Sequence, residues 1–239
     1  MARIENLNLS QRVTNELGQA IIGGHYTCDT GLPTEAKLCE EYGISRTAIR
    51  EAVKMLAAKG LISSRPRKGI QVEPSSNWNL YDTSVLKWML ESSPSLLVLK
   101  EFLQMRMAIE PQAAALAAEY ATDEDIAKIG EALEGMKASA KDPEKSFHDA
   151  DLAFHTSILF ASRNRFFFQL RDFISTALNV SIQHTTPAKG SIDSIVDEHN
   201  KVYQAIRSRQ PERARNMIHY LIDEAMSFIE AEIASKKAK

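Results

Sequence analysis

The sequence predicts a mainly α-helical protein of two parts, an N-terminal winged helix-turn-helix domain and a C-terminal all-α bundle of six or seven helices. Three observations predict this fold. The chain has 239 residues, enough for one large or two small domains at roughly 100–200 residues each. Apolar residues recur at helical spacing along most of the chain. Two short β-like runs fall between residues 61 and 72, and no β-alternating run follows them.

The composition is that of an ordinary globular protein, with 44% hydrophobic and 25% charged residues. It excludes disordered, collagen-like and disulfide-scaffold proteins. We expect no membrane segment and no signal peptide, because no apolar run approaches the ~20 residues of a membrane helix. Cys28 and Cys39 form neither a disulfide framework nor a C-x-x-C motif. We therefore expect a cytoplasmic protein with reduced thiols.

Residues 1–75 are predicted to contain three helices followed by two short strands. Polar caps begin the helices and glycines end them, as helix termini commonly require. A short helix, a glycine turn and a longer helix together form a helix-turn-helix. The strands are expected at Leu61-Ile62 and Ile70 to Val72, on either side of a basic loop that would be the wing. The residues that mark the helix ends are Ser10, Gly23, Gly24, Pro33, Thr34, Gly43, Ser45 and Gly60.

The charge distribution indicates DNA binding although the net charge is -2. Seven Lys and Arg residues lie between positions 44 and 72, against Glu51 alone. Arg46, Thr47 and Arg50 fall at the start of the third helix and off its apolar stripe, where a recognition helix reads bases in the major groove. The alternative is a solvated basic face and turn. The loop of Arg65, Arg67, Lys68 and Gly69 would lie over phosphate or the minor groove.

This N-terminal part resembles the GntR-type winged helix over about 60 residues. The resemblance rests on the runs Leu32-Pro33-Thr34-Glu35, Leu38-Cys39-Glu40, Ser45 to Ala52, and Leu56 to Ile62. It implies that Arg46, Arg50 and the wing glycine Gly69 contact an operator. A DNA-contacting arginine of some members falls here on Ala36, with Lys37 beside it. The expected DNA-binding residues are therefore Lys37, Ser45, Arg46, Thr47, Arg50, Arg65, Arg67, Lys68 and Gly69.

Residues 76–92 are predicted to be a linker with a short helix from Thr83 to Glu91, and residues 93–239 a helical domain. Pro111 lies inside the long helix and is expected to kink it or mark a join. Thr122 and Asp125 form a predicted capping box. The domain's expected helices are 95–120, one opening at Thr122, 143–162, 165–184, 191–208 and 211–236.

A polar centre is predicted inside this helical domain. Asp151 and His155 are four residues apart, so they project from one helix face, and apolar neighbours indicate that this face points inward. His199 and His219 lie on two further helices. One carboxylate and three imidazoles suit Zn²⁺, Ni²⁺ or Mn²⁺. The alternative is that each histidine is an ordinary core or surface residue.

The second part resembles the ligand-sensing FCD domain of the FadR subfamily. The resemblance rests on Arg106 with Glu110, Ala113 to Ala118, Asp151-x-x-x-His155, Glu198-His199 and His219. It implies a divalent metal, zinc first, held by Asp151, His155, His199 and His219. It also implies that a small carboxylate effector binds this metal and pairs with Arg106. The expected effector-binding residues are Arg106, Glu110, Asp151, His155, His199 and His219.

The segment from Asn77 to Leu90 is similar to the corresponding segment of galactonate-responsive repressors in this subfamily, which implies an aldonate or uronate effector. We therefore expect a homodimeric transcription repressor on a palindromic DNA operator, and not an enzyme. One alternative is a metal-dependent enzyme on a helical bundle, but the sequence lacks paired Glu-x-x-His motifs and a His-Glu-x-x-His motif. A second is a DNA-binding scaffold whose bundle only dimerises.

Overall fold

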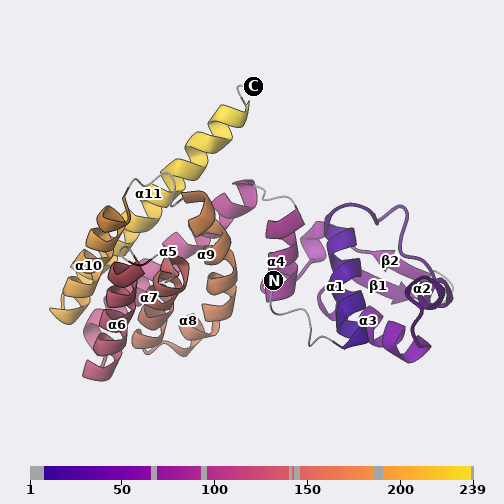
Figure 1. The fold of residues 1–239 in the computed structure, drawn as a ribbon, viewed down its shortest axis with the longest axis horizontal. Helices are drawn as coiled ribbons and strands as arrows, with labels where there is room; N and C mark the ends of the chain where they lie inside the picture. Colours follow the sequence, from indigo (N-terminus) through magenta and orange to yellow (C-terminus); the bar gives the residue numbers. More distant parts are fainter. Residues whose placement is uncertain are drawn as a thin grey trace. The chain divides into compact units, whose positions relative to one another are not determined.

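The computed structural model describes residues 8–65, 69–92, 96–139, 142, 146–185 and 191–237 (Figure 1). The chain divides into two compact units, Met1–Pro94 and Ser95–Lys239. Within the described residues, no helix is both long and apolar enough to cross a membrane.

The first unit has the predicted winged helix-turn-helix order. Its first helix begins at Leu9, one residue after the N-cap Asn8. The side chain of Asn8 accepts from the Gln11 amide in a capping box, so this helix starts earlier than a Ser10 cap predicts. Gly43 adopts a left-handed conformation (φ 63°) that separates the two helices of the motif. The two strands pair antiparallel, with Ile62 opposite Val72. The elements are α1 (Leu9–Ile22), α2 (Glu35–Tyr42), α3 (Arg46–Ala58), β1 (Ile62–Arg65), β2 (Gly69–Val72), the 3₁₀ turn η1 (Ser75–Asn77) and α4 (Thr83–Ser92).

The segment 76–92, predicted to be a linker, instead belongs to the packed core of this unit. Trp88 on α4 is 2% exposed, and its indole Nε1 donates to Asn15 Oδ1 on α1 at 2.6 Å. Its ring covers Gly18, where any Cβ would overlap it. Asp82 accepts from the Ser84 amide at the start of α4 and also pairs with Lys59 at the end of α3. The Trp88–Asn15 and Lys59–Asp82 contacts join residues distant in sequence, so a local pattern does not reveal them.

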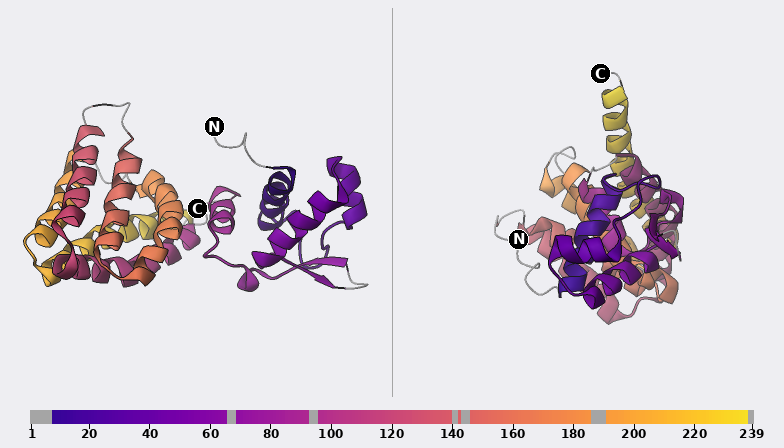
Figure 2. Two further views of the ribbon diagram at one scale, coloured as in Figure 1. Left: turned by 90° about the horizontal axis from the view of Figure 1, so that it is seen from below. Right: turned by 90° about the vertical axis from the view of Figure 1, so that its right-hand side faces the viewer.

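The second unit is an all-α bundle, as predicted, with seven helices among its described residues (Figure 2). The long first helix runs through Pro111 without a break, whereas the helix predicted at 165–184 is divided at Leu170. The helices are α5 (Leu96–Tyr120), α6 (Asp123–Ser139), α7 (Phe147–Ala161), α8 (Arg165–Gln169), α9 (Arg171–Thr185), α10 (Ile192–Arg207) and α11 (Pro211–Lys237).

Helix α7 brings polar groups into the middle of this bundle. It packs against α5, α6 and α9, while α11 lies along α5. Its buried stripe combines Phe154 and Ile158 with Asp151 and His155. Burial of the apolar residues stabilises the packing of α7 against its neighbours. The same packing withdraws Asp151 and His155 from bulk water.

We predict that Trp88→Ala loosens the first unit, because it removes a buried aromatic ring and leaves Asn15 without its donor. The expected loss of protection in α1 is about 3–5 kcal/mol, measured by amide hydrogen exchange in the full chain. Lys87→Ala, on the exposed side of the same helix, should change it by less than about 0.5 kcal/mol. Equal protection in both variants would contradict the placement of α4 in this unit.

Candidate nucleic-acid interface and candidate metal centre

The N-terminal end of α3 presents exposed polar and basic side chains. Ser45 caps the helix by accepting from the Ala48 amide at 3.3 Å. Arg46, Thr47 and Arg50 are exposed, because the buried stripe of α3 consists of Ile49, Ala52, Val53 and Leu56. An exposed helix start with arginines is the arrangement that a recognition helix needs to enter a DNA groove.

Two charged contacts lie on the same surface. The Nε of Arg50 donates to Glu35 on α2 at 3.1 Å, which orients the guanidinium across the two helices. Lys37 is exposed on α2 and is 3.8 Å from Glu41. Gly69 begins β2 with a φ of 73° and has open space around its Cα. Of the other expected wing residues, Arg67 and Lys68 and the side chain of Arg65 lie outside the described residues.

In the second unit, three of the four expected metal ligands converge. Asp151 and His155 from α7 and His199 from α10 are each at most 6% exposed. One ligand atom from each lies within 4.8 Å of the other two. Asp151 Oδ1 is 3.0 Å from His199 Nε2 and 3.4 Å from His155 Nε2.

The chemistry of these atoms fits a divalent cation. His199 Nδ1 lies 2.8 Å from the Ile195 carbonyl, to which only an N–H can donate, so the neutral ring has a bare Nε2. That Nε2 faces a carboxylate oxygen, and neither atom makes a hydrogen bond of normal geometry. Two ligand atoms of a tetrahedral zinc ion with bonds of about 2.1 Å lie about 3.4 Å apart, close to the observed separations.

A buried ion pair lies next to this group. Arg106 on α5 donates from Nε and Nη2 to the two oxygens of Glu110, at 2.5 and 3.0 Å. Glu110 Oε2 is also 2.8 Å from His155 Nδ1. Burial raises the pKa of Glu110, but the charges of Arg106 and His155 outweigh burial and lower this pKa to about 2.

The other two titratable groups are shifted by the same neighbours. Burial raises the pKa of Asp151, but the neighbouring imidazoles of His155 and His199 outweigh burial and hold that pKa well below its usual range. Burial lowers the pKa of His155, yet the charge of Glu110 and the contact with Asp151 raise it overall, against the opposing charge of Arg106. The buried group is therefore electronegative and favours a cation.

His219 does not join this group. It is exposed on α11, whereas the buried stripe of that helix includes Ile218 and Ile222. The sequence pattern could have indicated this position. His219 directly follows Ile218 of the buried stripe, and each residue of an α-helix is rotated by about 100° from the one before it. His199 by contrast lies between Ile195 and Val202 on the buried stripe of α10. His148, one turn before Asp151, is half-buried and also lies outside the converging group.

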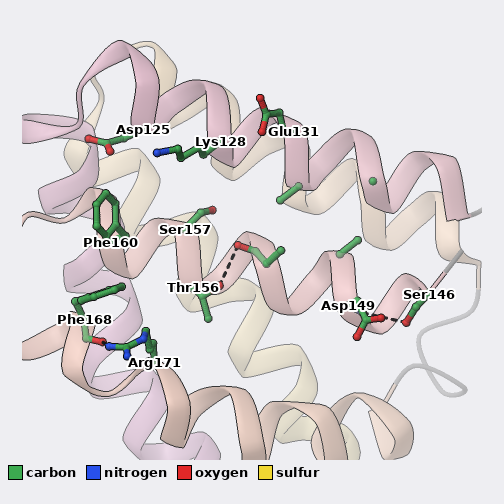
Figure 3. A pocket seen from close by; sticks show the side chains of 14 residues that line it. Asp125, Lys128, Glu131, Ser146, Asp149, Thr156, Ser157, Phe160, Phe168 and Arg171 are labelled. Atoms are coloured by element: carbon green, nitrogen blue, oxygen red, sulfur yellow. Dashed lines mark hydrogen bonds between the residues drawn. The ribbon is translucent and has the colours of Figure 1, made fainter. Parts of the chain in front are cut away.

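A groove lies between α6 and α7, on the face of α7 that carries Ser157 and Phe160 (Figure 3). It has a volume of about 800 Å³ and is lined by residues of α6 and α7, with Phe168 and Arg171 at one end. Its cations are already engaged: Lys128 pairs with Glu124 at 2.7 Å, and Arg171 stacks on Phe168. The converging, unsatisfied atoms of the buried group make that group the stronger candidate site.

Comparison with known protein families finds two matches. The family described as bacterial regulatory proteins, gntR family, matches residues 9–72, and the FCD domain matches residues 101–224. The first match spans the helix-turn-helix and the wing. The second spans all three converging ligands together with Arg106 and Glu110.

Individual relatives agree with these matches. The galactonate operon transcriptional repressor of Escherichia coli is 35% identical over 87% of this chain and 91% of its own length. The uncharacterized HTH-type regulator YieP of the same species is 38% identical over 83% of this chain and 86% of its own. The solved structure of Lar, which controls the expression of the Listeria monocytogenes agr system, superimposes with a TM-score of 0.62 at 20% identity, covering 95% of this chain and 99% of that one.

Proposed function

The chain belongs to the gntR family of bacterial regulatory proteins and carries an FCD domain, and we propose that it represses genes for the catabolism of a galactonate-like sugar acid. It is a DNA-binding transcriptional regulator. The observation that carries the finer proposal is the convergence of Asp151, His155 and His199 beside the buried Arg106. The 35% identity to a galactonate operon repressor supports the choice of effector.

On the DNA side, we propose that Arg46, Thr47 and Arg50 of α3 read the major groove and that the wing contacts the backbone. Two copies would place their recognition helices about one helical turn apart on a palindromic operator. Each phosphate contact releases counterions, so binding should weaken steeply with salt.

On the effector side, we propose that Asp151, His155 and His199 hold a divalent ion. Zinc is the first candidate, and nickel and manganese are the alternatives. When bound, the ion supplies a Lewis-acid centre with a coordination position open to a carboxylate oxygen. Charge balance supports an anionic ligand. Arg106, Glu110 and Asp151 with neutral imidazoles sum to one negative charge, which a divalent ion converts to one positive charge.

Effector binding would shift the protein between two arrangements with different affinities for DNA. The differential contact that we propose for this is the one between the effector carboxylate and the guanidinium of Arg106, which is buried and fixed on α5. Because the ion and the guanidinium come from different helices, one carboxylate would join α7 and α10 to α5.

We predict that galactonate releases the zinc-loaded protein from DNA taken from upstream of its own gene, measured by fluorescence anisotropy. Gluconate, galacturonate and glucuronate serve as comparison ligands. Arg106→Lys keeps the charge beside Glu110 but loses the planar fork, so half-release should need about 10–100-fold more galactonate with DNA affinity unchanged.

Arg215→Lys changes a half-buried arginine of α11 that pairs with Glu212; it is the matched control and should respond like the natural chain. DNA binding without release by any of the four acids would contradict the sugar-acid effector. An unaltered response of Arg106→Lys would remove Arg106 from the effector site.

For the DNA interface, Arg46→Ala should weaken operator binding about 5–150-fold, or about 1–3 kcal/mol, because a bidentate arginine–guanine contact is lost. Arg12→Ala removes the same charge from the exposed side of α1, where Arg12 pairs with Glu16, and should change binding little. Titration of labelled operator DNA measures both. Equal affinities of the two variants would exclude Arg46 from base recognition.

For the metal centre, His155→Gln should abolish the binding of about one zinc ion per chain, because it removes one of three converging ligands. His219→Gln should retain the ion, since His219 is exposed on α11. Dialysis against zinc followed by elemental analysis gives both stoichiometries. Loss of zinc from His219→Gln would restore the four-ligand set that the family resemblance implies.

A further inference from the structure

Glu110 is buried between the proposed effector-binding arginine and a proposed metal ligand, and it contacts both of them. We propose that Glu110 is a positioning residue of the metal centre: it holds the His155 ring in the orientation and tautomer that present Nε2 to the ion. This inference deepens the proposed function and rests on it. Glu110 is not among the converging ligand atoms, so it acts through His155.

The contact between Glu110 and His155 determines which ring nitrogen carries the proton. Glu110 Oε2 lies 2.8 Å from His155 Nδ1, and a carboxylate can only accept. Nδ1 therefore donates, and in the neutral ring Nε2 keeps its lone pair. That Nε2 is the atom directed towards Asp151 Oδ1, at 3.4 Å.

His199 reaches the same state through a different partner. Its Nδ1 donates to the Ile195 carbonyl, one turn earlier on α10, at 2.8 Å. Both histidines thus have Nδ1 anchored and Nε2 presented, one by a side chain of another helix and one by its own backbone. Such outer partners of metal-bound histidines typically contribute 10–100-fold to metal affinity. The backbone anchor is built into α10, whereas the anchor of His155 depends on one replaceable carboxylate.

Arg106 fixes Glu110 in this role. Its Nε and Nη2 both donate to Glu110, one turn along α5, and the two side chains are 4% and 2% exposed. The guanidinium neutralises the carboxylate, which permits its burial. Two donor nitrogens of Arg106 are therefore already hydrogen-bonded to Glu110. A ligand that moves the Arg106 guanidinium would also move the Glu110 carboxylate and, through it, the His155 ring. This places Glu110 between the effector contact and the metal ligand.

The test is Glu110→Gln in the full chain, with Glu119→Gln as the control. Glu119 is exposed on the same helix, so its substitution makes the same charge change away from the site. Zinc affinity, measured by competition with a chromogenic chelator, should fall about 10–100-fold in Glu110→Gln and stay unchanged in Glu119→Gln. Circular dichroism confirms folding. If Glu110→Gln does not fold, Glu110→Asp keeps the charge beside Arg106 and is expected to lose zinc affinity through its shorter reach.

A second measurement distinguishes positioning from a merely structural role. Long-range ¹H–¹⁵N spectra of the metal-free protein at about pH 8.5, above the usual imidazole range, report the tautomer of each histidine. His155 should carry its proton on Nδ1 in the natural chain and lose this fixed tautomer in Glu110→Gln, while His199 is unaffected. An unchanged tautomer with unchanged zinc affinity would overturn the proposal.

The proposed metal centre and the proposed positioning role of Glu110 can be refuted separately. If the natural chain binds no zinc, the proposed metal centre fails, while the tautomer of His155 in the metal-free protein still tests the contact with Glu110. If the natural chain binds zinc and Glu110→Gln binds it equally well, the metal centre stands and the positioning role of Glu110 is refuted.

Discussion

The interior of the second unit depends on the balance of charge in one buried group. Arg106, Glu110, Asp151, His155 and His199 are all withdrawn from water, and an unpaired charge there would cost several kcal/mol. Arg106 and Glu110 balance each other through a bidentate contact on α5. Among the described residues, Asp151 lies beside the imidazoles of His155 and His199. Its negative charge is balanced when those rings are protonated or when a cation lies next to it.

The buried group consists of polar residues on otherwise apolar helix stripes. Helices α5, α7 and α10 each bury polar side chains among residues such as Leu103, Phe154 and Val202. The apolar contacts stabilise the bundle, and the polar atoms gather where the three helices meet. The family matches and the buried group agree, because the FCD domain match includes all five residues of this group.

The first unit follows a different rule. Its charged residues on α3 stay exposed, and its stability comes from an apolar core that includes Leu17, Leu38, Ile49 and Leu56. The segment that leads to the second unit is held to this core by the contact of Trp88 on α4 with Asn15 on α1, and by the Lys59–Asp82 pair at the end of α3. Helix α4 therefore continues the DNA-binding unit, and residues 93–95 between α4 and α5 lie outside the described residues.

Features that depend on local pattern could be predicted from the amino-acid sequence. Helical periodicity predicted the all-α second unit, and cap residues predicted the start of α3 at Ser45 and of α6 at Thr122. The spacing of Asp151 and His155 predicted that they share a face. The resemblance to the GntR family and its FCD domain, which the comparisons confirm, rests on the same kind of short motifs.

The tertiary structure alone decided which distant residues meet. Trp88 packs on Gly18 some seventy residues away, which moves the boundary between the units beyond α4. His219 is one position off the buried stripe of α11, and the resulting rotation of about 100° separates it from the other three candidate ligands. Glu110 pairs with Arg106 one turn away on α5, but it contacts His155 only because α5 packs against α7. Such contacts depend on helix packing and rotation, which are set by the summed burial of many side chains and not by any one motif.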